Sequence, residues 1–431
     1  MNSITRSSTA YSKVFLGVIL ATGVGTIVIQ WIYRPFKSTK RKPDHPRGTS
    51  TRPAGHSSDY PHVAHKVTDF IGNTPLLRIN CLSDSTGVEI WAKCEFLNPG
   101  GSIKDRIALQ IIREAEKKGT IVPYASPRCR VFEGTSGSTG ISLALVARAL
   151  GYEAEIVLPD DTAVEKSQLI ENMGATIVKV RPVSISNRSH YVNVARDRAQ
   201  RFIEEGGKGL FVDQFENQMN WLTHYQTTGP EIWQQSRGKV DYFVAGAGTG
   251  GTIAGVGRFL KSVASDVQLI LADPPGSGLF NKVKHGVMFS KTEIEGKRRR
   301  HQIDTVVEGI GSNRLTGNLA QIIDLVDDAI SVTDEEAIEL SRLILKNEGL
   351  FIGSSSAVNL VASHKLAQQI KLGREDQQQS NGERTRIVTI LCDSGQRHLS
   401  KFWNDQFLVQ HGFLNKPSSS SESESESVSP F

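Results

Sequence analysis

Asn98-Pro-Gly-Gly-Ser-Ile-Lys-Asp-Arg106 is the most informative stretch of the chain, because it places Lys104 where a strand pattern gives way to a helix pattern. The pattern of residues 88–96 predicts a strand, and Pro99-Gly100-Gly101 predicts a turn. Residues 103–118 have apolar residues at helical spacing. Lys104 is therefore expected in the first helical turn, where the helix dipole disfavours an ammonium ion. This field and desolvation would lower the pKa of Lys104 and favour its use as an amine nucleophile. A solvated surface lysine is the alternative.

A second motif, Glu133-Gly-Thr-Ser-Gly-Ser-Thr-Gly140, is also a strand end followed by a helix start. Its glycines let the backbone approach a ligand. The free N–H groups of the coming helix, together with the hydroxyls of Thr135, Ser136 and Thr139, can hold a carboxylate. An ordinary strand-to-helix turn with capping residues is the alternative interpretation.

A third motif, Gly246-Ala-Gly-Thr-Gly-Gly-Thr252, follows a predicted strand and opens a predicted helix. Its glycines allow backbone N–H groups to converge, so phosphate is the expected ligand. A dinucleotide fingerprint would lie near the first strand, with an acid about 20 residues further on, and a P-loop would contain a lysine. Neither condition is met, so nucleotide binding is not expected.

A fourth motif, Ile390-Leu-Cys-Asp-Ser-Gly-Gln-Arg-His-Leu-Ser400, completes the set. In this order the four motifs resemble those of the cysteine synthase and cystathionine β-synthase family, fold-type II enzymes that use pyridoxal phosphate. The likeness extends from Val67 to Phe402. It implies an α/β fold like that of the tryptophan synthase β chain, with two three-layer αβα subdomains. Residues 66–412 would form the catalytic domain, with a smaller mobile subdomain at about 100–216.

The resemblance assigns a role to each matching residue. Lys104 would hold pyridoxal phosphate as a Schiff base and serve as the catalytic base. Ser138 stands where the family usually has Asn beside the phenolic oxygen of the cofactor, and Ser394 would face the pyridine nitrogen. The other expected cofactor-binding residues are Gly248, Thr249, Gly250, Gly251 and Thr252. The expected substrate-binding residues are Thr135, Ser136, Gly137, Thr139, Gln214 and Gly309.

Four departures or details affect the expected chemistry. Ser138 is shorter than Asn, so its contact with the cofactor would be weakened or would pass through a water. A neutral hydroxyl at Ser394 would favour loss of a β-substituent over transamination. Cys392 replaces a usual Pro and is expected to be a packed small residue. Arg314 could bind a charged group of the substrate or could be solvated.

The implied reaction joins O-acetylserine and sulfide to give cysteine and acetate. Cystathionine β-synthase and cysteine desulfhydrase activities are alternatives, since the first half of the reaction is shared. A membrane-tethered interaction protein with a degenerate fold is the non-enzymatic alternative. The resemblance also implies a homodimer.

Haem and structural metals are not expected. No Cys precedes Cys81, whereas the haem-binding members of the family use an N-terminal Cys and His. The cysteines lack paired zinc or disulfide spacing; they are Cys81, Cys94, Cys129 and Cys392.

The net positive charge of the chain comes from its N-terminal segment. The formal net charge is +5, but residues 1–52 hold nine Lys or Arg and one acid, so residues 53–431 have a net charge of −3. Nucleic-acid binding is therefore not expected. The cluster Lys297-Arg-Arg-Arg-His301 reads as an exposed insertion.

Val14–Tyr33 is a run of 20 residues without charge. At ~1.5 Å per residue it would span ~30 Å, the hydrocarbon thickness of a bilayer, and basic residues follow it directly. We expect residues 1–33 to carry a retained single-span anchor, residues 34–65 to be a basic flexible linker, and the location to be a mitochondrial membrane, with the outer membrane as the first choice. A cleaved secretory signal is the alternative.

From Thr68 onward, strand and helix patterns alternate, which predicts mostly parallel sheets covered by helices. The predicted strands are 129–133, 153–158, 176–180, 210–213, 240–245, 267–272 and 386–391. The predicted helices are 138–150, 164–173, 228–235, 250–262, 334–348 and 355–370. Residues 416–431 are rich in Ser and Glu and are expected to be disordered.

Overall fold

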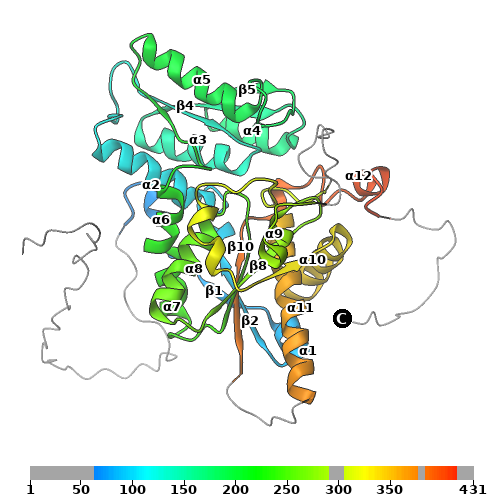
Figure 1. The fold of residues 1–431 in the computed structure, drawn as a ribbon. Helices are drawn as coiled ribbons and strands as arrows, with labels where there is room; N and C mark the ends of the chain where they lie inside the picture. Colours follow the sequence, from blue (N-terminus) through cyan, green and yellow to red (C-terminus); the bar gives the residue numbers. More distant parts are fainter. Residues whose placement is uncertain (1–62, 291–304, 377–383, 415–431) are drawn as a thin grey trace, which may run out of the picture. The chain divides into compact units, whose positions relative to one another are not determined.

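The structure is a computed structural model that describes residues 63–290, 305–376 and 384–414 (Figure 1). Within these residues the strands form two sheets. In spatial order the larger sheet consists of β1 (Leu76–Arg78), β2 (Glu89–Cys94), β10 (Arg386–Leu391), β7 (Tyr242–Gly246), β8 (Gln268–Asp273) and β9 (Asp328–Ser331). The smaller sheet consists of β5 (Thr176–Val180), β4 (Glu153–Pro159), β3 (Arg130–Gly134) and β6 (Gly209–Phe211). All neighbouring strands are parallel except β1 with β2.

Helices cover both faces of each sheet (Figure 1). On the larger sheet, one face carries α1 (Asn80–Thr86), α10 (Asp334–Glu348) and α11 (Ser354–Asp376). The other face carries α6 (Met219–Gln226), α7 (Thr228–Gln235) and α8 (Gly251–Val263). On the smaller sheet, α5 (Tyr191–Glu204) lies on one face and α3 (Ser138–Leu150) and α4 (Val164–Asn172) lie on the other. The three further helices are α2 (Lys104–Lys117), α9 (Leu279–His285) and α12 (Asp405–Gln410). Helix α2 packs on α3.

The apolar cores follow from the period-two alternation of the strands. Along β10, Ile387 and Leu391 contribute to the core beneath α10 and α11, whereas Val388 and Ile390 contribute to the core beneath α8. Because both faces are buried, the strand reads as an almost continuous apolar run, which is typical of parallel sheets. A third apolar core lies between the smaller sheet and its helices.

The predicted α/β class with mostly parallel sheets is confirmed, and five elements begin and end at the predicted residues. These are α3, α7, α10, β5 and β10. Strand β6 is shorter than predicted, since the chain turns at Asp213, which has a φ of 53°. Helix α11 continues beyond the predicted residue 370 to Asp376. Seven elements were not predicted: α1, α5, α6, α9, α12, β1 and β9.

Several predictions fall outside the described residues. They are the span at Val14–Tyr33, the linker up to residue 62, the basic cluster at 297–301 and the tail at 416–431. None of the helices in the described parts of the chain combines the length and the apolar composition that crossing a bilayer requires. The mobility of the segment at about 100–216 stays a prediction.

A buried network of charges orients helix α2, which begins at Lys104. Arg106 on α2 lies with its Nε 2.7 Å from Glu95 Oε2 and its Nη1 2.7 Å from Glu231 Oε1 on α7. Lys93 on β2 lies 2.6 Å from the other oxygen of Glu231. The side chains of Lys93 and Glu95 are fully buried, so each charge depends on its partners for stabilisation. The network therefore ties the start of α2 to the larger sheet.

We expect Arg106→Met to destabilise the protein by about 3–5 kcal/mol, because it leaves the buried carboxylate of Glu95 without its main partner. The matched control is Arg113→Met on the same helix, where an exposed arginine pairs with Glu116 and the expected loss is below about 1 kcal/mol. Urea unfolding of both variants measures the difference. Equal losses would contradict the importance of the buried network.

Candidate active site

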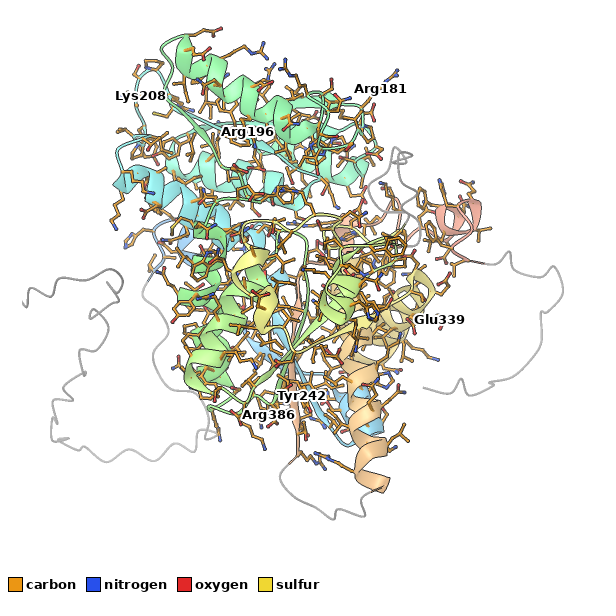
Figure 2. All side chains as sticks on the ribbon, in the orientation of Figure 1. Arg181, Arg196, Lys208, Tyr242, Glu339 and Arg386 are labelled. Atoms are coloured by element: carbon orange, nitrogen blue, oxygen red, sulfur yellow. The ribbon has the colours of Figure 1, made fainter. Side chains whose placement is uncertain are left out.

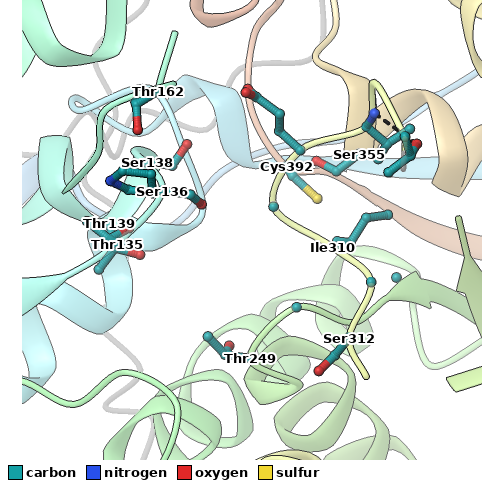
Figure 3. A pocket seen from close by; sticks show the side chains of 18 of the residues that line it. Thr135, Ser136, Ser138, Thr139, Thr162, Thr249, Ile310, Ser312, Ser355 and Cys392 are labelled. Atoms are coloured by element: carbon teal, nitrogen blue, oxygen red, sulfur yellow. Dashed lines mark hydrogen bonds between the residues drawn. The ribbon is translucent and has the colours of Figure 1, made fainter. Parts of the chain in front are cut away.

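A cavity of about 1010 Å³ lies at the carboxyl ends of strands from both sheets, the usual position of ligand sites in open α/β sheets. Tyr242 and Arg386 mark the opposite end of the larger sheet, where β7 and β10 begin (Figure 2). Figure 3 shows the hydroxyl-rich wall formed by residues 135–139 facing a second wall that includes Ile310 and Cys392. Two glycine-containing loops and the turn after β10 therefore meet at one cavity.

Lys104 lines this cavity as the first residue of α2. Burial lowers the pKa of Lys104, although Cys392 and Asp393 partly oppose this effect. None of the ion pairs between described residues includes Lys104. The preceding turn is fixed by Asp105, which accepts a hydrogen bond from the N–H of Gly100. The structure thus presents an amine of reduced basicity to the cavity.

The segment Thr135–Thr139, which we call the carboxylate loop, connects β3 to α3. Thr135, Ser136, Ser138 and Thr139 line the cavity, whereas Gly137 does not. Gly137 has a φ of 145°, in the region that favours glycine. The loop brings hydroxyl groups and the start of α3 to one wall, as anion binding requires.

Gln214 is held at the edge of the carboxylate loop. Its Oε1 accepts a hydrogen bond of 2.6 Å from Thr139 Oγ1, and its Nε2 donates one of 3.1 Å to Glu133 Oε1. Its carbonyl oxygen accepts from the side chains of Asn220 and Asn318. Burial raises the pKa of Glu133 to about 8, which the hydrogen bonds from Gln214 partly oppose. The raised pKa favours the protonated, neutral form of Glu133 near pH 7.

The second loop, Gly248–Thr252, which we call the phosphate loop, opens helix α8. Gly248, Thr249, Gly250 and Thr252 line the cavity, and Gly251 lies just behind them. A Cβ on Gly251 would lie 1.9 Å from Asn220 Oδ1, so only glycine fits there. Thr249 Oγ1 accepts a hydrogen bond of 3.0 Å from Asn220. The loop is a rigid, positively polarised cradle suited to a phosphate.

Gly309 lines the cavity and packs directly on the phosphate loop. A Cβ on Gly248 would lie 2.2 Å from the carbonyl oxygen of Gly309, so this close approach requires glycine at position 248. Gly309 itself has a φ of 87°. Arg314, further along the same segment, also lines the cavity; it pairs with Glu216 at 2.6 Å and lies over the ring of Phe215.

The turn after β10 brings Cys392 and Asp393 to the cavity. Ser394 is not among the residues that line the cavity, and its Oγ accepts a hydrogen bond of 3.3 Å from the N–H of Gln396. Its predicted role toward the cofactor ring stays a prediction. Cys392, expected to be a packed small residue, packs against the core beneath α8 and also lies on the cavity wall (Figure 3). Burial raises the pKa of Cys392 to about 11, so the group facing the cavity is a neutral thiol.

A chain of charges on the cavity wall was not predicted. His398 Nε2 lies 3.3 Å from Asp393 Oδ2, and His398 Nδ1 lies 3.3 Å from Glu308 Oε2. Burial disfavours charge on all three groups. Attraction to neighbouring charges nevertheless outweighs burial: Asp393 raises the pKa of His398, His398 lowers the pKa of Asp393, and Lys166, followed by His398, lowers the pKa of Glu308. The position of Asp393 directly after a predicted strand was the available sequence signal.

We expect the stability of the protein to fall as the pH rises between about 5 and 8, in part because of Glu133. The pKa of Glu133 is about 8 in the folded protein and 4.5 as its unperturbed value. The folded state therefore binds more protons than the unfolded state in this window, and each pH unit costs up to about 1.4 kcal/mol. Glu133→Gln should flatten this part of the pH profile. Urea unfolding at several pH values tests this, and an unchanged slope would contradict it.

Comparison with known proteins adds independent information. Cysteine synthase 2 of Schizosaccharomyces pombe is 50% identical over 83% of this chain and 88% of its own length. A Saccharomyces cerevisiae protein named "Putative mitochondrial cysteine synthase" is 50% identical over 82% of this chain and 87% of its own. The O-acetylserine dependent cystathionine β-synthase of Helicobacter pylori has a solved structure that matches with a TM-score of 0.63 and 30% identity, covering 79% of this chain and 98% of that one.

The residues at the cavity fit pyridoxal phosphate. Lys104 supplies the amine that this cofactor requires, and the phosphate loop supplies backbone groups that glycine leaves accessible. The family model described as "Pyridoxal-phosphate dependent enzyme" matches residues 67–393. The match extends over more than half of the chain and includes Lys104 and both glycine-containing loops. The chain therefore belongs to the family of pyridoxal-phosphate dependent enzymes.

Proposed function

We propose that the protein is a cysteine synthase, which converts O-acetylserine and sulfide into cysteine and acetate with pyridoxal phosphate as its cofactor. The observation that carries the proposal is the position of Lys104, an amine of lowered pKa in the same cavity as the carboxylate loop and the phosphate loop. The relatives named cysteine synthase, at 50% identity over most of the chain, support the choice of reaction.

Each part of the cavity has a distinct task in this proposal. The phosphate loop at the start of α8 anchors the cofactor, and the carboxylate loop at the start of α3 orients the amino acid. Lys104 removes the α-proton of the amino acid with its Nζ. Bound pyridoxal phosphate would supply the electron sink that this deprotonation requires. Gln214 forms hydrogen bonds with Thr139 and Glu133 and thereby holds the carboxylate loop in position at the cavity.

Exclusion of water is the remaining requirement, because a reactive β-carbon must meet sulfide rather than solvent. The carboxylate loop comes from the smaller sheet, and Glu308–Gly311 comes from the chain after β8 of the larger sheet. The two segments lie on different walls of one cavity and can close it from both sides.

We expect Lys104→Ala to lower cysteine formation at least about 100-fold, the lower end of what a positioned proton-transfer group contributes. The full-length protein is purified with added pyridoxal phosphate, given O-acetylserine and sulfide, and assayed for cysteine. The variant should also lose the visible absorbance of the cofactor linked to a lysine. Retention of both absorbance and turnover would refute the assigned role of Lys104.

Cystathionine β-synthase activity is the second candidate, because the matched Helicobacter pylori structure carries that name and depends on O-acetylserine. Replacing sulfide with homocysteine in the same assay distinguishes the two, and sulfide release from cysteine tests the desulfhydrase alternative. A purified protein that binds no pyridoxal phosphate would instead favour a non-enzymatic interaction protein.

For the location, we propose a mitochondrial membrane, with Val14–Tyr33 as a single-pass anchor in the outer membrane and a homodimeric catalytic part. The uncharged run and the basic residues after it support the anchor, and the relative named as mitochondrial supports the location. The proposal of a homodimer rests on the family resemblance alone. A reporter fused to residues 1–52 should co-localise with mitochondria and resist alkaline extraction. A reticular pattern would refute the location, and full extraction would refute the anchor.

A further inference from the structure

Lys166 on α4 connects the two walls of the cavity. Its stem packs against the carboxylate loop, where a Cβ on Gly137 would lie 2.4 Å from Lys166 Cδ. Its Nζ forms an ion pair with Glu308 on the opposite wall. The side chain is only 3% exposed, although it is a lysine. A lysine is rarely buried to this extent unless its charge is paired.

The contact of Lys166 with Glu308 continues into the phosphate loop. The residue after Glu308 is Gly309, whose carbonyl oxygen packs on Gly248. The N–H of Glu308 donates a hydrogen bond of 3.0 Å to Ser354 Oγ at the start of α11. A continuous line of contacts therefore runs from Gly137, through Lys166 and Glu308, to the loop that would hold the cofactor.

The ion pair is electrostatically well defined. Burial opposes ionisation of Glu308, but Lys166, followed by His398 and Lys401, outweighs it and keeps the pKa of Glu308 well below its usual range. Lys401 Nζ lies 3.4 Å from Glu308 Oε1. Removing Lys166 would thus leave a largely buried carboxylate with weaker partners, which is unfavourable.

Two further contacts join the α4 side of the cavity to the segment after β10. Ser400 donates hydrogen bonds of 3.0 Å and 2.7 Å to the two oxygens of Glu165, the neighbour of Lys166 on α4. Lys401 Nζ donates one of 2.9 Å to the carbonyl oxygen of Asp161. The contact residues on the smaller-sheet side are Asp161, Glu165 and Lys166, which lie within six positions of one another in the sequence.

We propose that Lys166 is a positioning residue that couples the carboxylate loop to the Glu308–Gly311 segment. When an amino acid orders the carboxylate loop, the stem of Lys166 is fixed against Gly137, and its ammonium then holds Glu308 so that the segment closes over the cavity. The inference rests on the proposed function only in assigning an amino-acid carboxylate to that loop. It names a residue outside the four sequence motifs.

The test compares Lys166→Met, which keeps the stem and removes the charge, with Lys261→Met as a matched control. Lys261 pairs with Asp327 at 2.9 Å and contacts neither wall of the cavity. Loss of a charge-assisted contact should raise the KM for O-acetylserine about 10-fold or more in Lys166→Met. The control should keep the KM of the unchanged protein, and Lys166→Arg should recover most of the affinity.

Hydrogen exchange of the full-length protein with bound pyridoxal phosphate separates positioning from simple loss of stability. O-acetylserine without sulfide should slow exchange in the peptides that cover 135–139 and 305–312 of the unchanged protein. In Lys166→Met, only the first peptide should be protected. Glu308→Gln should lose the protection of 305–312 in the same way. The KM of the double variant should be only slightly higher than that of either single variant, because the two side chains act as a pair.

Protection of 305–312 in Lys166→Met as in the unchanged protein, or an unchanged KM, would overturn the coupling. The exchange result does not depend on cysteine formation, because sulfide, the second substrate, is absent from that measurement. A failure of the proposed function would instead appear as absent cysteine formation in the unchanged protein and in the Lys261→Met control alike.

Discussion

Among the described residues, several helices begin at one cavity, and this convergence is the constraint on which the site depends. The cavity-lining residues at these helix starts include Lys104 of α2, Ser138 and Thr139 of α3, Tyr191 of α5, Gly250 and Thr252 at the start of α8, and Ser355 of α11. Each helix start carries a partial positive charge and unpaired N–H groups. The helix starts are thus suited to two anionic groups, a phosphate and a carboxylate. The same field disfavours an ammonium ion, which agrees with the lowered pKa of Lys104.

Irregular loops can surround such a cavity only if their backbone N–H and C=O groups form hydrogen bonds and the loops can lie close to one another. The carbonyl of Gln214 receives two side-chain amides, from Asn220 and Asn318, at the junction between the two sheets. The carbonyl of Thr249 accepts a hydrogen bond of 2.6 Å from Thr316. These hydrogen bonds from side chains to the backbone replace the backbone hydrogen bonds that a helix or a strand would provide. The loops therefore hold a defined shape, although they belong to neither a helix nor a strand.

The polar contacts around the cavity fall into two groups with different consequences. At the start of α2, the network of Arg106, Glu95 and Glu231 joins the helix to the larger sheet in a largely buried setting. At the opposite wall, Lys166 and Glu308 join segments of different sheets beside the cavity itself. The first group stabilises the position of Lys104. The second group lies where an incoming substrate can change its surroundings.

Local sequence alone determined the elements that carry the chemistry. The turn Pro99-Gly100-Gly101 before a helical pattern located Lys104, and the apolar run of Arg386–Leu391 located a central strand, because chain geometry and burial on both faces leave periodic signals. Short elements such as β1, with three residues, carry no such signal. Only the tertiary structure decided which side chains after β10 reach the cavity, since the exit direction of a turn depends on its neighbours. It also brought Lys166 to Glu308, 142 positions away, because an ion pair between distant segments leaves no periodic trace in a single sequence.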